Sequence, residues 1–459
     1  MAVEKGAPRL PRTLGQRDLV LLKIVAIVNF SLIPAVSVYG RATLLVWLLA
    51  FGVFFVPSMV AVLSLARRYP GEGGVYLWAR RQFGDLNGFL SGWCYWTNNL
   101  FYIPMQLVYI AGVAAFAGPD PKALGDNKGF VTAIALGWLV IATVANVYGL
   151  RFGKWLQNVG AFSLMTLGVL IVLAAVSAWS SGVAEQPPWV RDVDWSMLPA
   201  FSVMCLAFVG IELASTMGDE IVRPERNLPR AAAIAGIVTL LAYLVVTAAL
   251  LALVPWREIG VVQGLMQALQ RGAARAGMGW LVAPAGIFTA LAIGGSAAAW
   301  FAGSSRIPFV AGVGQALPAW LGRVHPRWGS PYTAIIANGV LSGVLTGVAL
   351  TGSTVTEAYQ QLLNSTVVIQ MIPFLYLFAG LMRLEGASGF SRAMGLLGLL
   401  ATALATVIAF FPPQDVKNVL LFETKMIAGV SLTLALGLIF YWRARSRASR
   451  RSTSAGVAR

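Results

Sequence analysis

An acidic side chain stands inside an otherwise apolar run, and its position indicates chemistry in the membrane. Residues 195–216 are apolar over about one membrane thickness, and they contain Glu212 two residues after Gly210. A carboxylate at that depth is costly, so it normally faces a cavity or a partner. The segment that follows contains Pro224 and Pro229 and cannot continue the helix. The run therefore predicts a membrane helix broken near its midplane, with Glu212 at the break. The alternative is a straight helix in which Glu212 is a hydrogen-bonded packing residue.

Glu212 differs from the other acidic residues of the chain. Of the 18 Asp and Glu residues, the other seventeen fall in loops, tails or near the ends of apolar runs. No basic residue lies near Glu212 in its own segment. Desolvation favours the protonated form of a carboxylate unless another helix supplies a partner. Glu212 is therefore a candidate proton-coupling residue.

A second interruption lies in the first apolar run, at Asn29-Phe-Ser-Leu-Ile-Pro34. Pro34 cannot donate to the helix hydrogen bonds, and its ring crowds the carbonyl of Phe30. A break here frees backbone groups that lipid cannot satisfy, so it should line a cavity. An ordinary proline kink is the alternative.

The composition is that of an all-α polytopic membrane protein. Hydrophobic residues make up 58% of the chain and charged residues 11%, whereas soluble domains carry roughly 25% charged residues. The net charge of +16 fits basic loops beside a membrane and does not require nucleic acid. Cys94 and Cys205 lie in apolar runs, so we expect neither a disulfide nor a metal, and no cofactor. One histidine, His325, and one buried glutamate do not make a catalytic cluster, so we do not expect an enzyme.

Apolar stretches predict twelve membrane spans by their length and the breaks between them. These are residues 19–39, 44–66, 86–117, 130–150, 155–179, 196–216, 231–254, 280–304, 331–351, 358–382, 393–411 and 422–442. Residues 75–83 are expected to form a short amphipathic helix at the membrane interface, anchored by Tyr76 and Trp78.

Basic residues orient these spans. If both termini are cytoplasmic, 25 of the 34 Lys and Arg residues lie inside, with Lys23 counted among those of the N-terminal arm. The positive-inside rule then places the arm, residues 1–18, and the basic tail, residues 443–459, in the cytoplasm, with the chain in the plasma or inner membrane. The tail is expected to contact anionic lipid.

The order of the spans predicts one transporter domain over residues 1–459 with an internal inverted repeat. Residues 19–179 and 196–382 hold five spans each, an odd number, so the two sets have opposite orientation. Residues 393–442 add two helices. The interrupted spans 1 and 6 occupy corresponding positions, which is typical of a midplane site in inverted-repeat transporters. No clear residue-level similarity relates the two halves.

Three motifs resemble those of the amino acid–polyamine–organocation superfamily. They are residues 207–215 with 219–230, residues 70–84, and residues 305–309 with Leu317-Pro318 and 325–331. The resemblance implies a LeuT-like fold of five plus five helices and two extra helices, with helices 1 and 6 broken around the substrate.

The same resemblance implies which residues bind. A substrate carboxylate would be held by the freed backbone amides at the break of helix 1, next to Asn29. The residues concerned are Ser31, Leu32, Ile33, Pro34 and Ala35, of which Pro34 has no N–H. Carbonyls of Ala207, Phe208, Val209 and Gly210 would hold its amino group, with Phe208 in or next to an aromatic gate. Glu212 matches an acidic position that the similar arginine–agmatine antiporter uses in proton sensing.

Two departures from the superfamily pattern matter. The usual Gly-Ser-Gly-like break of helix 1 is replaced by Asn29–Pro34, which is closer to the glutamate–GABA antiporter branch. Residues 163–166, midway along the fifth span, contain no lysine, so lysine-based coupling and a sodium site are not expected there.

The predicted function is secondary active transport of amino acids or related amines by alternating access, coupled to protons. Obligate exchange without proton coupling is the main alternative, and a non-transporting substrate sensor is another. The expected partners are a small-molecule substrate, protons and the lipid bilayer. The sequence leaves open the substrate, the choice among symport, exchange and uniport, and the oligomeric state.

Overall fold

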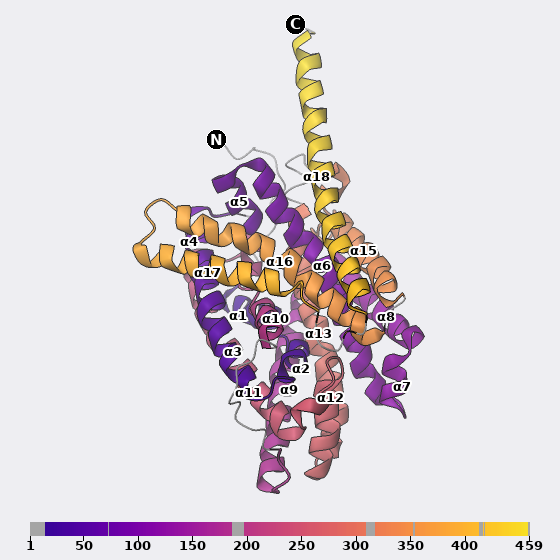
Figure 1. The fold of residues 1–459 in the computed structure, drawn as a ribbon. Coiled ribbons are helices and arrows are strands. Elements are labelled where there is room, and N and C mark those ends of the chain that lie inside the picture. Colours follow the sequence, from indigo (N-terminus) through magenta and orange to yellow (C-terminus); the bar gives the residue numbers. More distant parts are fainter. Residues whose placement is uncertain are drawn as a thin grey trace.

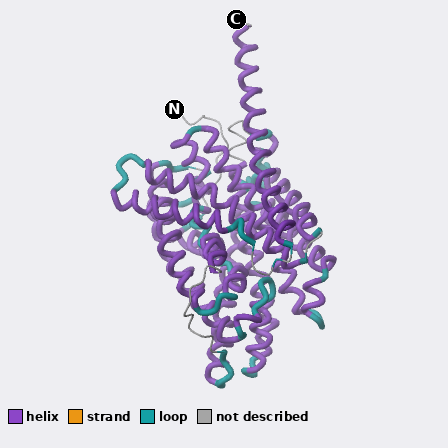
Figure 2. Tube along the Cα trace, in the orientation of Figure 1, coloured by secondary structure: helices purple, strands orange, loops and turns teal. Residues whose placement is uncertain are grey.

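The computed structural model is helical throughout the part of the chain that it describes. The described residues are 14–71, 73–185, 197–308, 317–351, 354–412, 416 and 418–457, so most of the predicted N-terminal arm and the last two residues of the tail lie outside them. Within these ranges the only β pairing is a single bridge between Leu14 and Ile221. The prediction of an all-α chain is confirmed (Figure 2).

Eleven helical segments among the described residues are long and apolar enough to cross a membrane. The predicted span 196–216 is not one of them, because it divides into a short helix, a turn and a 3₁₀ segment. The long helices are α6 (Asp85–Ala114), α8 (Lys128–Val147), α9 (Leu150–Ser180), α11 (Pro224–Leu253), α13 (Val282–Ser304), α15 (Tyr332–Leu350), α16 (Val355–Arg383), α17 (Gly389–Ile408) and α18 (Val419–Val457).

Two further crossings are composed of several elements. The first combines α1 (Gln16–Ile27), η1 (Phe30–Leu32) and α2 (Ile33–Ser37), and the second combines α3 (Ala42–Ala50), the π-helix η2 (Phe51–Phe55) and α4 (Val56–Arg68). The divided sixth segment is α10 (Leu198–Ala207) with η5 (Leu213–Glu220).

The two ends of the bundle carry different short elements. Figure 1 shows the helix α5 (Val75–Phe83) and the end of α18 at the top, and α7 (Pro121–Asp126) and α12 (Gly264–Ala268) at the bottom. We call these ends the α5 side and the α12 side. The N–H of Gly73, in the loop before α5, donates to the carbonyl of Thr216 in η5, so η5 lies on the α5 side. Ile221 directly follows η5, and its bridge to Leu14 therefore lies on the same side.

The outer surface of the bundle is apolar in the way that a lipid environment requires. Large side chains such as Val140 on α8, Ile237 on α11 and Leu432 on α18 are about 60% exposed. A soluble protein rarely exposes so many large apolar side chains over one continuous surface. Together with the eleven long apolar helices, this surface indicates a multi-pass membrane protein.

Small residues allow a close contact between the backbones of α9 and α13. A Cβ atom built on Gly295 would lie 2.6 Å from the Cα of Gly160, and the reverse substitution would meet the same clash. Two glycines therefore allow the backbones of α9 and α13 to pack directly against each other.

The helix predicted at residues 75–83 is α5, but its anchors are not where we expected them. Tyr76 is 6% and Trp78 is 3% exposed, so neither ring reaches lipid. The indole of Trp78 donates to the carbonyl of Tyr69 at 3.2 Å. The anchoring prediction was wrong because α5 packs against α6 and α16, with Tyr76 next to Gly92 of α6.

Candidate functional site

The first helical crossing is interrupted at its middle. α1 ends at Ile27, and Asn29 has an extended backbone with φ −130° and ψ 96° before η1 begins. Pro34 falls in the first turn of α2, where its missing N–H costs no hydrogen bond. The chain therefore breaks here, rather than bending at a proline kink.

The sixth crossing is interrupted opposite the first. α10 ends at Ala207, and Gly210 then takes φ +125°, a conformation that side chains with a Cβ rarely adopt. A Cβ on Gly210 would lie 3.1 Å from Cγ1 of Ile27 and 3.2 Å from the carbonyl of Ala26. The two breaks are therefore in direct contact, and the straight-helix alternative is wrong.

A tyrosine from α11 joins the two breaks. The hydroxyl of Tyr243 accepts from the backbone N–H of Asn29 at 3.0 Å. It also lies 2.8 Å from the carbonyl of Ile27 and 2.9 Å from that of Ala207. Trp47 stacks on the ring at 4.2 Å. Tyr243 thus contacts backbone groups of both interruptions, and nothing in the apolar run 231–254 distinguished it beforehand.

Asn29 organises a neutral polar cluster at the break of helix 1. Its side-chain oxygen accepts from the amide of Ser31 at 3.1 Å and its side-chain nitrogen donates to Tyr102 at 3.2 Å. The hydroxyl of Ser31 donates to Gln106 at 2.9 Å, and Tyr102 lies 3.2 Å from Ser296. The predicted carboxylate-binding amide of Ser31 is therefore capped by the side chain of Asn29 in this conformation.

Two small cavities of about 10 Å³, each with room for about one water molecule, flank this cluster. Four of the predicted binding residues line the first: Asn29, Leu32, Ala207 and Val209. Asn29 and Ser31 line the second. No side chain lining either cavity is charged. Asn98, which also lines the first cavity, has a side-chain oxygen without a hydrogen-bond partner among the described residues.

The remaining predicted binding residues lie outside both linings. Phe208 packs edge-on against Trp47 and Tyr243, with ring centroids 5.6 and 5.5 Å away. Pro34 faces α12, where a Cβ on Gly264 would lie 2.9 Å from the proline ring. Ile33 is buried, Ala35 is half-buried, and Gly210 makes the backbone contact with α1 described above.

Glu212 is fully buried beside the break of helix 6. One carboxylate oxygen accepts from the backbone N–H of Gly210 at 3.0 Å, and the other accepts from the hydroxyl of Tyr95 on α6 at 3.1 Å. Glu212 is therefore linked to the shape of the break itself. Glu212 is not among the residues that line the two cavities.

Lys23 is the residue near Glu212 that sequence reasoning missed. It lies on α1 with 1% of its surface exposed, and its ammonium donates to the carbonyl of Ile211 at 2.5 Å. We had counted Lys23 with the basic residues of the N-terminal arm, and this was wrong. Lys23 comes from another helix, so its position in the chain gave no signal.

A larger hollow of about 350 Å³ opens on the α5 side. Its lining includes Tyr69, Trp78, Ser215 and Glu225. The hydroxyl of Ser215 donates to the backbone carbonyl of Glu212. One residue that lines the hollow, Ser215, is therefore in direct contact with Glu212.

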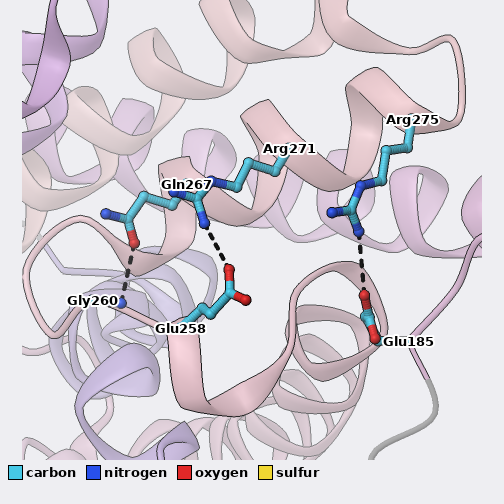
Figure 3. Close-up of polar contacts among 6 residues, drawn as sticks. All are labelled: Glu185, Glu258, Gly260, Gln267, Arg271 and Arg275. Carbon is cyan, nitrogen blue, oxygen red and sulfur yellow. Dashed lines mark hydrogen bonds and ion pairs between the residues drawn. The ribbon is translucent and has the colours of Figure 1, made fainter.

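On the α12 side, α12 and the π-helix η7 (Leu269–Ala273) are held over the bundle by exposed polar contacts (Figure 3). Arg271 pairs with Glu258 at 2.9 Å, and Arg275 pairs with Glu185 at 3.2 Å. Gln267 accepts from the N–H of Gly260 at 3.1 Å. These bonds fix the segment whose Gly264 contacts Pro34.

No group of three or more His, Cys, Asp or Glu side chains among the described residues could hold a metal ion. What the arrangement offers is a set of backbone groups, amides and hydroxyls around two helix breaks, with one buried carboxylate and one buried ammonium beside them. Such groups bind and release small polar molecules and protons.

Comparison with known proteins decides the family. The family model described as amino acid permease matches residues 14–435. The chain belongs to the amino acid permease family. The predicted membership of the amino acid–polyamine–organocation superfamily is thereby confirmed.

Several relatives of this permease carry the similarity over most of their length. An uncharacterized transporter of Legionella pneumophila is 26% identical over 94% of this chain and 96% of its own. A protein of Lactococcus lactis named as a probable agmatine/putrescine antiporter is 21% identical, covering 91% of this chain and 92% of its own. The branched-chain amino acid permease of Bacillus subtilis is 25% identical, covering 75% and 76%.

Proposed function

We propose that this permease is a secondary active transporter that moves amino acids or related amines by alternating access, with Glu212 as its proton-coupling residue. The observation that supports this proposal most is the contact between two broken helices beside a small cavity whose lining includes Asn29, Asn98 and Tyr102. Broken helices present backbone N–H and C=O groups that bind the carboxylate and ammonium groups of a substrate. Family membership favours amino acids and amines as the substrate class.

We assign substrate binding to the backbone of the breaks and to neutral side chains. The cavity linings contain Asn29, Asn98, Tyr102 and Ser296 but no charged residue. A substrate carboxylate that binds the amide of Ser31 must displace the side chain of Asn29. Because Glu212 bonds to Gly210 and Tyr95, it does not pair with a cationic substrate in this conformation.

The cavities are too small for an amino acid, so the substrate must enter through a conformation in which one side has opened. We propose that the α5 side is cytoplasmic and that the protein lies in the plasma or inner membrane, in line with the distribution of its basic residues. Obligate exchange without proton coupling is the second candidate, and the relative named as an agmatine/putrescine antiporter favours it.

The test is a transport screen with purified protein in proteoliposomes. Labelled amino acids and the amines agmatine and putrescine are offered with and without an inward proton gradient. We expect uptake of at least one compound, increased by the gradient. Exchange that ignores the gradient supports the second candidate, and no movement of any compound by folded protein overturns both.

A further inference from the structure

Lys23 is a buried charged group to which the proposed transport cycle gives no role. Its ammonium reaches across from α1 to the carbonyl of Ile211, the residue before Glu212. Taking an ammonium out of water is expensive unless it is paired and hydrogen-bonded. A side chain that serves only packing would not need this charge, so its position requires another explanation.

The surroundings of Lys23 contain one evident source of compensation. Glu212 is the residue next to Ile211, which accepts from the ammonium of Lys23, and the side chains of Lys23 and Glu212 are 1% and 0% exposed. Tyr95 is the titratable group in direct contact with the carboxylate. On the helices packed against α1, Tyr243 of α11 bonds to the breaks, and residues 155–180 of α9 and 282–304 of α13 contain no charged residue.

Other charged residues on these elements lie at their ends. They are Glu225, Arg226 and Arg230 in the first turns of α11, and Arg306, which follows α13 and donates to Ala302. The side chains of Arg151, Lys154, Asp219 and Glu220 are outside the described part. Lys23 and Glu212 are therefore the two opposite charges that the described interior places together.

We propose that Lys23 and Glu212 form one proton-binding site that joins α1 to the break between α10 and η5, with Lys23 as the positioning residue. The proposal rests on the proposed role of Glu212 in proton coupling. With the carboxylate charged, the buried pair is neutral as a whole. When a proton from the solution adds to the carboxylate, the ammonium of Lys23 remains as an uncompensated buried charge.

That uncompensated charge links the proton to a movement. Water that reaches Lys23 from the α5 side would stabilise the ammonium, and it requires α1 to separate from η5. The hollow lined by Ser215 brings solvent close to this point, since Ser215 bonds to the backbone of Glu212. Protonation of Glu212 therefore favours opening on the α5 side.

A double-mutant cycle tests the pair without any substrate. Thermal unfolding is measured for the purified wild type, Lys23→Met, Glu212→Gln and the double variant. The measurements run from about pH 5 to about pH 9 in steps of about one pH unit. We expect each single variant to lower the unfolding temperature, because it leaves one buried charge alone. The double variant should recover more than half of the summed loss and lose the pH dependence. Losses that simply add would overturn the proposal.

The pH profile of transport gives a second readout, which a purely structural role would not move. Counterflow of labelled leucine, arginine and agmatine is measured for the wild type, Lys23→Met and Lys23→Arg. In Lys23→Met the midpoint of the curve of counterflow rate against pH should move to higher pH by at least about one unit. The reason is that the carboxylate of Glu212 loses the cation that favours its charged form. Lys23→Arg should stay closer to the wild type.

The two proposals fail in different ways. Lys122 is exposed on α7, so Lys122→Met is the matched control for loss of one positive charge. If the unfolding losses of the two single variants do not add but no compound is transported, the proposed function is contradicted and the proposal of a Lys23–Glu212 pair stands. Proton-driven transport with a wild-type pH profile in Lys23→Met contradicts the pair and leaves the function intact.

Discussion

Opposite charges lie in a buried and in an exposed region of this permease, and the surroundings of the two regions differ. Lys23 and Glu212 are 1% and 0% exposed at the broken helices, whereas the side chains of Arg271 and Glu258 on the α12 side are 52% and 56% exposed. Two unit charges 4 Å apart attract by about 1 kcal/mol in water and about 4 kcal/mol at the effective dielectric of a protein surface. Burial also removes the water that would stabilise either charge alone.

The comparison separates two uses of charge. The exposed pairs Arg271–Glu258 and Arg275–Glu185 hold a surface segment and can lose a partner to water at little cost. The buried charges cannot, so a change in the protonation of one must be answered by a change in the structure around the other. The buried region is where protonation can drive movement, and the exposed region is where it cannot.

The largest effect is expected at the backbone of the buried region. Gly210→Ala places a Cβ at φ +125° and 3.1 Å from Ile27, so we expect a loss of about 2–4 kcal/mol from backbone strain and overpacking. Gly277 on the α12 side has φ +72° with open space around it. Gly277→Ala should therefore cost only about 1 kcal/mol. Thermal unfolding of both variants checks the difference; equal losses would show that the contact with Ile27 is unimportant.

A smaller effect is expected from one hydroxyl. Tyr95→Phe removes the donor to Glu212 and should cost about 1.5–3 kcal/mol when the carboxylate is charged. Since the lost bond favours the charged form, the penalty should shrink at low pH. Tyr109 on the same helix has a buried hydroxyl without a partner among the described residues, so Tyr109→Phe should be nearly neutral. Unfolding at several pH values measures both, and a pH-independent penalty for Tyr95→Phe would contradict the account.

The smallest effects are expected on the α12 side. Arg271→Gln and Arg275→Gln should each cost less than about 1 kcal/mol, because both pairs are exposed to solvent. At roughly 1 M salt, where the Debye length is about 3 Å, the difference from the wild type should disappear. Thermal unfolding at low and high salt measures this. A loss as large as that of Lys23→Met would remove the distinction between the two regions.

The sequence predicted what depends on local pattern. The break at Asn29–Pro34 could be inferred from a proline among small polar residues. Glu212 stood out because a carboxylate inside an apolar membrane segment is costly. The bounds of α5 also followed from the chain. Each of these signals lies within one short stretch.

What the sequence did not give depends on contacts between distant segments. Lys23 lies 188 residues before Ile211, and Tyr243 lies 214 residues after Asn29. Both look ordinary in their own helices, one as a basic residue near the N-terminus and the other as a tyrosine in an apolar run. The burial of Tyr76 and Trp78 was missed for a similar reason, because α5 also packs against α16, which is far from it in the chain.

Proton-driven transport by the wild type and by Glu212→Gln is the most direct test of the account. Both proteins are reconstituted in proteoliposomes, and uptake and exchange of a transported amino acid or amine are compared with and without an inward proton gradient. We predict that the gradient stimulates the wild type, and that Glu212→Gln still exchanges substrate but no longer responds to it. Equal exchange by both proteins at every pH would show that Glu212 is structural and that this permease is an obligate exchanger.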